Sequence, residues 1–254
     1  MIAIFNPEYK DFENSLLKYI TDFDSQGIDF VIGQRNQIKL FQIPNQTINI
    51  KSFKVPHLIN RFVYKYFRKS KARRSFEYAN QLILLDIGTP KPIGFIEHTS
   101  FIGLNKSFYI SEQLPCDLTF RTLIEDVNYP DCENILRQFT RFCFDLHQKG
   151  IEFLDHSPGN TLIKKTKQGT YTFFLVDLNR MEFHNTMDFN QRMKNLCRLT
   201  PLREMIVVMS NEYAKCSYES ESLIFETLWA YTSQFQEQFY RKKKLKKKLK
   251  FWRK

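Results

Sequence analysis

The sequence has few residues that break regular structure and no motif that binds transition metals. Glycine occurs 8 times and proline 9 times in 254 residues, whereas hydrophobic residues make up 43% of the chain and phenylalanine occurs 25 times. This composition excludes a long structureless chain, because there is ample apolar area for a packed core. The five cysteines form no CxxC pair, and the five histidines form neither an HExxH motif nor a Cys/His cluster. We therefore expect reduced thiols, and any bound metal should be Mg²⁺ held by oxygen.

The sequence also lacks the signals of export and of membrane spanning. No run approaches the roughly 18 consecutive apolar residues of a transmembrane helix. The N-terminal segment MIAIFNPEYK lacks the basic-then-apolar order of a secretory leader. These absences predict a cytoplasmic protein that does not cross a membrane.

Positive charge is concentrated at one end of the chain. The net charge is +11, and residues 241–254 (RKKKLKKKLKFWRK) contain ten Lys or Arg and no acid, so subtracting ten leaves +1 for the other 240 residues. A nucleic-acid-binding domain would spread its charge over a folded face, so we expect no nucleic-acid partner. Leu245, Leu249 and Trp252 have helical spacing among the lysines. This pattern favours an anionic membrane surface, with a solvated disordered end and a polyanion such as RNA as alternatives.

The order of predicted elements indicates an α+β fold with two lobes. Residues 1–24 are expected to be irregular and then helical. Residues 28–54 contain short segments that are β-branched or alternating, and this pattern predicts three antiparallel strands. Two more strands are predicted after a basic helix over residues 58–85. From residue 118 onward helices dominate, interrupted by one small hairpin. We expect a domain over residues 1–240, with an N-lobe at about 25–112, a C-lobe at about 116–240 and a separate tail, 241–254.

Three polar residues after residue 150 have the chemistry required for phosphoryl transfer. Asp155 and Asn160 lie five positions apart in a loop after a predicted helix, and Asp177 follows the apolar strand FFLV. Such a reaction needs a carboxylate that accepts a proton from the attacking hydroxyl, and oxygen ligands for Mg²⁺. Asp155 fits the first role, and Asn160 and Asp177 fit the second. A turn acid at Asp155 and a turn-stabilising amide at Asn160 are the alternatives.

These motifs resemble those of the protein-kinase-like superfamily. The segment DHSPGN resembles the D-x-x-x-x-N catalytic loop, VDLN stands where the metal-binding D-F-G is found, and INIK resembles the third-strand V-A-I-K. The resemblance makes Lys51 the phosphate-binding lysine, with Lys54 as the competitor, and Glu77 its ion-pair partner. Within the superfamily the chain looks most like the lipopolysaccharide kinases of Kdo or heptose, in particular the Bacteroidetes-type Kdo kinase relatives. The resemblance implies a bilobal fold, ATP with Mg²⁺, a Kdo-lipid A or core glycolipid as acceptor, and work at the inner face of the inner membrane.

Departures from the pattern define the remaining expectations. The first two residues of H-R-D are replaced by Phe153 and Leu154, and the glycine of D-F-G by Asn179. The Gly-rich loop is reduced to IGQRN, so phosphate contact is expected from Gly33, Gln34, Arg35 and Asn36. Adenine is expected to meet the backbone of the hinge from Glu112 to Leu114. Arg180 and His156 are candidate substrate contacts.

Three other functions are consistent with parts of the sequence. The missing Gly-rich loop is also typical of a nucleotide-binding pseudokinase that serves as a scaffold. A kinase of a soluble alcohol, such as choline or an aminoglycoside, would share the polar residues, but the basic tail disfavours this function. A polyanion-binding protein without catalysis is disfavoured by the nearly neutral body of the chain.

Overall fold

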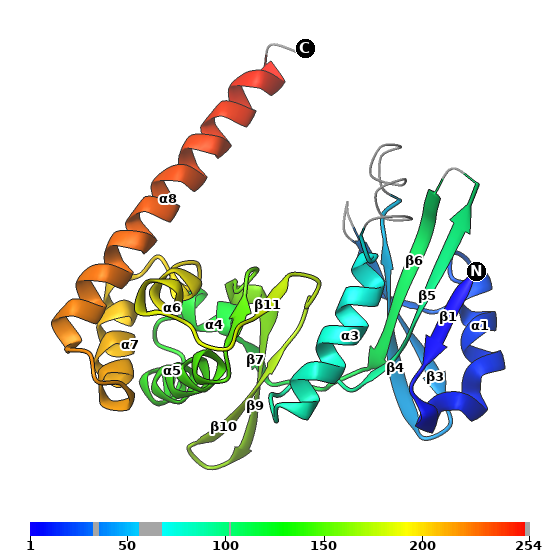
Figure 1. Ribbon diagram of the computed structural model, residues 1–254, viewed down its shortest axis with the longest axis horizontal. Coiled ribbons are helices and arrows are strands. Elements are labelled where there is room, and N and C mark those ends of the chain that lie inside the picture. The colour runs from blue at the N-terminus through cyan, green and yellow to red at the C-terminus, as the bar shows by residue number, and fades with distance from the viewer. Residues whose placement is uncertain (33–35, 56–67, 102, 252–254) are drawn as a thin grey trace. The chain divides into compact units, whose positions relative to one another are not determined.

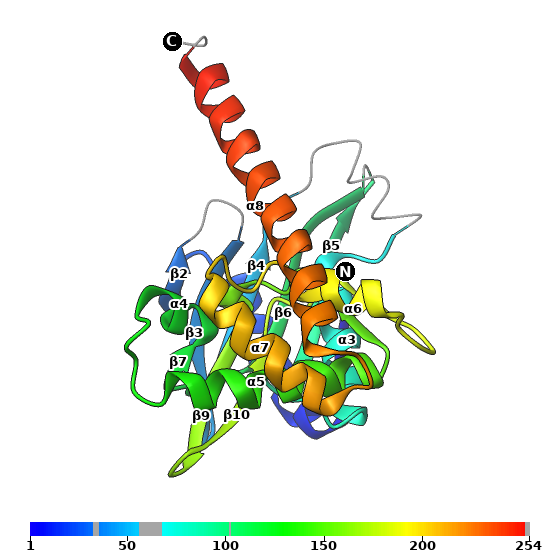
Figure 2. The same ribbon diagram turned by 90° about the vertical axis from the view of Figure 1, so that its left-hand side faces the viewer.

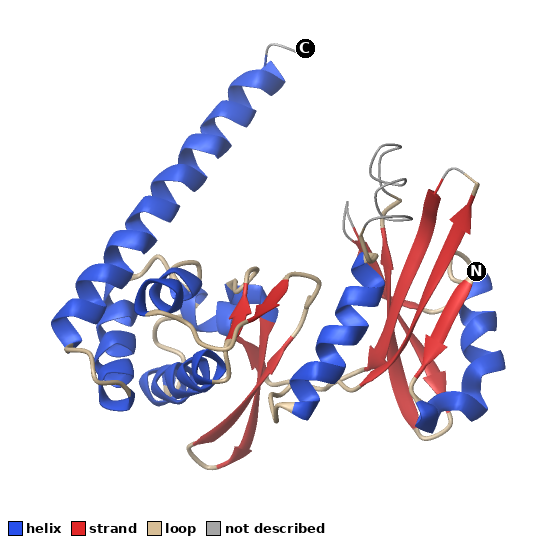
Figure 3. Ribbon diagram, in the orientation of Figure 1, coloured by secondary structure: helices blue, strands red, loops and turns tan. Residues whose placement is uncertain are grey.

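The computed structural model describes the whole chain except residues 33–35, 56–67, 102 and 252–254. It divides into two compact units, described separately below. Unit 1 contains Met1–Pro115 and Phe174–Arg180, and unit 2 contains Cys116–Phe173 and Met181–Lys254. The α+β fold class predicted from the sequence is confirmed, because antiparallel strands dominate the N-terminal part and helices the C-terminal part (Figure 3).

Unit 1 is built on a six-stranded antiparallel sheet with the order β1-β5-β6-β4-β3-β2 (Figure 1). Its strands are β1 (Ile2–Phe5), β2 (Ile28–Ile32), β3 (Asn36–Ile43), β4 (Gln46–Phe53), β5 (Pro92–Ser100) and β6 (Gly103–Glu112). Its helices are the 3-10 helix η1 (Pro7–Phe12), α1 (Glu13–Thr21) and α3 (Lys71–Leu84). The three consecutive strands expected over residues 28–54 are found as β2, β3 and β4.

The alternation of β4 directs its side chains to two separate cores. Ile48 and Ile50 are fully buried in a cluster with Leu16 of α1, and Phe53 packs with Phe76 of α3 on the opposite face. The two helices lie on opposite faces of the sheet (Figure 1). Because side chains in a strand alternate between faces, Lys51 lies on the same face as Phe53, beside α3.

Two elements of unit 1 differ from the sequence expectation. Of the helix predicted over 58–85, residues 58–67 lie outside the described residues, residues 68–70 are not helical, and α3 begins at Lys71. Ser70 accepts a hydrogen bond from the Arg73 N–H at 3.0 Å and caps this helix. Residues 1–24 are not simply irregular and then helical, because β1 pairs with β5 at the sheet edge. Such a short edge strand depends on its partner strand, so its local sequence gave no clear signal.

Unit 2 is mainly helical, with two small antiparallel sheets (Figure 2). Its helices are α4 (Phe120–Glu125), α5 (Cys132–Gln148), the 3-10 helix η2 (Pro158–Asn160), α6 (Phe189–Leu196), α7 (Arg203–Cys216) and α8 (Glu221–Phe251). Its strands are β7 (Leu118–Thr119), β8 (Ile151–Phe153), β9 (Thr161–Lys167), β10 (Thr170–Leu175) and β11 (Met181–Phe183), with the end of β10 in unit 1. Phe139 of α5, fully buried, lies in a core that reaches Leu228 of α8.

The described part of the basic segment 241–254 belongs to α8, which ends at Phe251. The first half of α8 packs on unit 2 through Ile224 and Leu228, whereas its second half extends beyond the other elements of that unit (Figures 1 and 2). Residues 241–246 are exposed. Among the described residues, no helix has the length and apolar character needed to cross a bilayer.

Candidate active site

In unit 1, Lys51 and Asp177 form an ion pair although they are 126 positions apart in the sequence. Lys51 Nζ lies 2.6 Å from Asp177 Oδ1, and the two side chains are only 12% and 34% exposed. Asn179 Nδ2 donates to the same oxygen at 2.8 Å. Both contacts use Oδ1, so Oδ2 has no hydrogen-bond partner in the described part of the chain and could serve as a ligand for a cation.

The backbone of Asp177 has an unusual conformation. Its φ of 60° lies in the left-handed region, which residues with a side chain seldom adopt. The conformation is costly by about 1 kcal/mol or more and occurs preferentially at functional sites. The Asp177 carboxylate contacts Lys51 of β4, and Asp177 follows β10 closely in the sequence.

The expected pair between Lys51 and Glu77 is not formed. Glu77 Oε2 accepts from Lys69 Nζ at 2.8 Å, and Glu77 Oε1 accepts from Arg73 Nε at 2.9 Å. Partial burial alone would raise the pKa of the Glu77 carboxyl, but these two cations outweigh burial and lower the pKa. The prediction is wrong in this structure, because Lys69 and Arg73 bind Glu77. Lys51 pairs with Asp177 instead.

In unit 2, three successive backbone carbonyls at the end of β8 are held by side chains. Asn195 Nδ2 donates to Phe153 O at 2.9 Å, and Arg198 Nη1 donates to Leu154 O at 3.0 Å. Asn160 Nδ2 donates to Asp155 O at 2.8 Å. This last bond uses the amide nitrogen of Asn160 and leaves its side-chain oxygen for a ligand. The loop that presents Asp155 is therefore fixed at each of the three residues leading to its carboxylate.

A network of buried polar side chains connects to this loop through Asn195. His147 Nε2 lies 3.3 Å from Asn195 Oδ1, and His147 Nδ1 lies 2.9 Å from the Tyr213 hydroxyl. A neutral imidazole satisfies both contacts, with Nε2–H donating to Asn195 and Nδ1 accepting from Tyr213. Burial favours that form, because it lowers the pKa of His147 to about 3. The sequence analysis missed His147, Asn195 and Tyr213, which are far apart in the chain and follow no local motif.

Arg198 also approaches the carboxylate of the loop. Its Nη1 lies 3.5 Å from Asp155 Oδ1, and the two side chains are 39% and 28% exposed. A guanidinium at this distance can orient the Asp155 carboxylate. The sequence analysis did not identify Arg198 either.

The two candidate substrate contacts have opposite environments. Arg180 is exposed, as a substrate contact must be. His156 is fully buried between the rings of Phe139 and Phe153, with centroids 5.8 and 5.5 Å away, so the suggested contact with substrate is wrong in this structure. Burial lowers the pKa of His156 to about 4, which keeps the ring neutral at pH values near 7.

The expected nucleotide-covering residues are only partly described. Gly33, Gln34 and Arg35 lie outside the described residues, and Asn36 begins β3 with its side-chain oxygen buried and without a hydrogen-bond partner in the described part of the chain. The Glu112 N–H donates to Lys91 O at 2.9 Å, so this hinge group is already occupied by protein. Leu114 follows β6 in an irregular, partly exposed segment.

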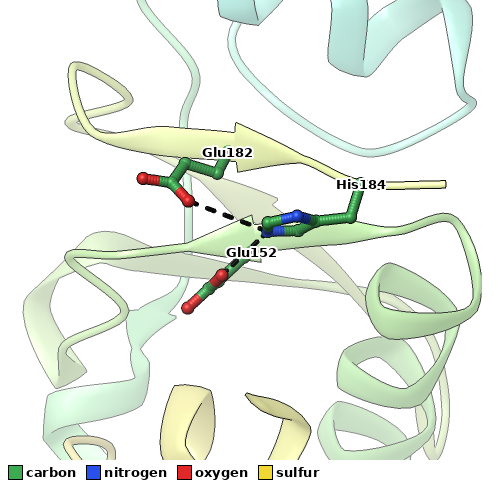
Figure 4. Close-up of side chains that lie close together, drawn as sticks. All are labelled: Glu152, Glu182 and His184. Atoms are coloured by element: carbon green, nitrogen blue, oxygen red, sulfur yellow. Dashed lines mark hydrogen bonds and ion pairs between the residues drawn. The ribbon is translucent and has the colours of Figure 1, made fainter. Parts of the chain in front are cut away.

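A separate cluster in unit 2 has the composition of a metal site (Figure 4). Glu152 of β8 and Glu182 of β11 are directly paired across the ribbon, and His184 follows them. His184 Nε2 lies 2.8 Å from Glu152 Oε2 and 3.9 Å from Glu182 Oε2. The three ligand atoms all lie within 4.8 Å of one another. The hydrogen bond between His184 Nε2 and Glu152 Oε2 links the segment after β11 to β8, so the cluster has a structural explanation.

Comparison with known proteins identifies the fold. No protein-family model and no curated protein matches the sequence. Among solved structures, the chain is similar to WaaP in complex with acyl carrier protein, with a TM-score of 0.65 and 15% sequence identity. The match covers 94% of this chain and 100% of the other. At this identity the likeness concerns the fold, and we conclude that the chain has a WaaP-like kinase fold.

Proposed function

We propose that the protein is an ATP- and Mg²⁺-dependent kinase that phosphorylates a sugar hydroxyl, that of Kdo, on lipid A or the lipopolysaccharide inner core. The observation that carries the proposal is the contact between Lys51 and Asp177, two residues from distant motifs of the kinase pattern. The WaaP-like fold and the fixed loop around Asp155 support the same class of reaction.

Each polar residue has one role in the proposed reaction. Asp155 orients the acceptor hydroxyl and accepts its proton, while Lys51 binds nucleotide phosphate. Asp177 of unit 1 has a free carboxylate oxygen and Asn160 of unit 2 a side-chain oxygen, and each is the type of ligand that Mg²⁺ prefers. When bound, Mg²⁺ would neutralise charge on the transferred phosphate. Enzymes that transfer phosphoryl groups need little covalent chemistry from their side chains. Most of the rate enhancement comes from positioning the reactants and from stabilising charge.

The ion pair balances the charges of two residues with proposed roles in binding the magnesium nucleotide. A poorly hydrated charge is costly unless it has a partner, and Lys51 and Asp177 provide partners for each other. A magnesium nucleotide offers phosphate to Lys51 and a cation to Asp177. Each charge thus keeps an opposite charge in the bound state.

The decisive experiment measures phosphate transfer from ATP to purified Kdo-lipid A precursor by mass spectrometry. We expect Asp155→Asn to lower kcat by about 100-fold or more while ATP binding stays near normal. The matched control is Asp145→Asn, which changes a half-exposed acid of α5 that pairs with Lys149. Full activity of Asp155→Asn contradicts the catalytic role.

The acceptor and the basic end of α8 support action at an anionic membrane surface on the inner face of the inner membrane. Residues 241–246 are exposed and include five Lys or Arg. Each basic residue near anionic lipid contributes about 1 kcal/mol. Flotation with anionic liposomes should bring the full chain, but not a chain lacking 241–254, to the lipid fraction. Equal flotation of both chains would exclude this role.

A pseudokinase scaffold is the second candidate, favoured by one observation. Glu77 is bound by Lys69 and Arg73 and not by Lys51, so the pair expected to position phosphate is not formed. A pseudokinase would bind ATP without transferring phosphate. The transfer assay on the wild-type protein separates the two functions, because ATP binding without any phosphorylated acceptor would favour the scaffold.

A further inference from the structure

A cavity of about 260 Å³ in unit 2 lies beside the Asp155 loop. It is lined by Arg121, Ile124 and Glu125 of α4, Pro158 of η2, Arg198, Pro201, and Phe235, Gln236 and Phe239 of α8. Pro158 belongs to the segment between Asp155 and Asn160, and Arg198 contacts the Asp155 carboxylate. The cavity therefore opens next to the group that would accept the acceptor's proton.

One side of the cavity is cationic. Arg121 is exposed and forms no ion pair within the part of the chain that the structure describes. It lies against Gly159, where an added Cβ would be 3.2 Å from Arg121 Nη2, so the glycine leaves room for the guanidinium beside the loop. Arg198 lines the same cavity and uses Nη1 for its two loop contacts. Glu125 is the only acid of the lining, so the two guanidiniums leave an excess of positive charge.

The other side is apolar and belongs to the helix that carries the basic tail. Phe235 and Phe239 stack with centroids 6.3 Å apart, and Phe239 is 50% exposed. The Arg198 guanidinium lies 5.2 Å from the Phe235 ring centroid, so the two halves of the cavity adjoin. Beyond Phe239 the same helix continues into the exposed basic residues 241–246. An exposed aromatic pair next to cationic groups suits a ligand with an acidic head and a hydrocarbon part.

We infer that this cavity binds the acceptor, through a carboxylate or phosphate on Arg121 and Arg198 and through apolar groups on Phe235 and Phe239. The inference deepens the proposed function and rests on it for the catalytic meaning of the cavity. Arg198 contacts both Asp155 and the cavity, so an acid held there places a neighbouring hydroxyl beside the Asp155 carboxylate. The ligand class is an anionic lipid-linked sugar, and Arg121 is a specificity-determining residue.

Binding can be measured without turnover. We would titrate dodecyl phosphate, inorganic phosphate and the neutral dodecyl maltoside, each below micelle formation, by isothermal calorimetry. We expect dodecyl phosphate to bind more tightly than either control ligand, and Arg121→Gln to weaken it by about tenfold. Phe239→Ser should weaken dodecyl phosphate but leave inorganic phosphate unchanged. The matched control is Arg203→Gln, since Arg203 is also exposed and lies over an aromatic ring, Phe225, in a different cavity of unit 2.

The outcomes of this titration are distinct. Wild-type affinity of Arg121→Gln for dodecyl phosphate would overturn the cationic half of the site, and unchanged affinity of Phe239→Ser would overturn the apolar half. Equal loss in Arg203→Gln would show that only general positive charge matters and would also overturn the inference.

Kinetics separate this inference from the proposed function. With Kdo-lipid A precursor, Arg121→Gln should raise the KM for the acceptor about tenfold and leave the KM for ATP unchanged. If Asp155→Asn abolishes transfer but Arg121→Gln leaves the acceptor KM unchanged, the cavity is not the acceptor site although the kinase assignment holds. If the wild type transfers no phosphate, the proposed function fails, while the calorimetry still decides whether the cavity binds an acidic lipid.

Discussion

Two buried histidines should make the protein lose stability when the pH falls from about 7 to 5. Burial lowers the pKa of His147 to about 3 and that of His156 to about 4, from an ordinary value of 6.5. In the unfolded chain both imidazoles take up a proton when the pH falls below 6.5, whereas in the folded chain they stay neutral down to pH values near their lowered pKa. Their contribution to stability is therefore full above 6.5 and is lost progressively as the pH falls toward the folded-state values.

The size of the stability loss follows from the difference between the unfolded-state pKa and the pH of the assay. One pH unit corresponds to about 1.4 kcal/mol for each proton taken up only by the unfolded chain. Lowering the pH to about 5 should thus remove about 2 kcal/mol of unfolding free energy for each histidine, or about 4 kcal/mol for both. Burial also lowers the pKa of His98, which adds to the loss with the same sign. The total is a large part of a typical stability of about 5–15 kcal/mol.

Urea unfolding at the two pH values and constant ionic strength measures this loss. The control variant is His156→Leu, because His156 packs against phenylalanine rings and neither of its ring nitrogens has a hydrogen-bond partner in the described part of the chain. This variant should lose about 2 kcal/mol less than the wild type between the two pH values. Equal stability of the wild type at both pH values would refute the reasoning, as would an unchanged pH dependence in the variant.

Three further predictions concern the loop, the surface and the tail. Asn195→Leu removes the donor to Phe153 O and the partner of His147, so it should lower the unfolding free energy by about 2 kcal/mol and reduce kcat without changing ATP affinity, measured by urea unfolding and the transfer assay. Glu77→Gln breaks two partly exposed ion pairs and should cost less than about 1 kcal/mol in the same unfolding assay; a larger loss would mean that Glu77 has a structural role beyond them. Removal of residues 241–254 should leave the Tm within about 2 °C, because residues 241–246 are exposed, and a larger fall in a thermal scan would show that the tail packs on the domain.

Local patterns anticipated much of unit 1. Alternation in INIKSF placed Ile48 and Ile50 in one core and Lys51 and Phe53 on the other face, and the structure confirms this division. Such a pattern is reliable because a strand exposes successive side chains to opposite faces whatever its neighbours are. The edge strand β1 and the three-residue strands β8 and β11 were missed, because pairing with distant partners stabilises them more than their own sequence does.

In the candidate site, too, sequence motifs predicted short-range features better than contacts between residues far apart in the chain. Motif spacing identified Asp155 and Asn160, whose bond spans only five positions, and it named Lys51 and Asp177 as members of one pattern. It did not show that Glu77 would be taken by Lys69 and Arg73, nor that His156 would face inward. Both outcomes depend on competition among neighbours that the folded chain brings together.

The sequence by itself determined the fold class and the two strand faces, and it named candidate residues for phosphoryl transfer. These follow from the period of each element and from the chemistry of single side chains, which are local properties. Only the tertiary structure decided which charges pair, that Asn195 and Arg198 hold the Asp155 loop, and that Arg121 and Phe239 line one cavity beside it. The energies of ion pairs depend on distance and burial in three dimensions, and local sequence patterns predict neither quantity.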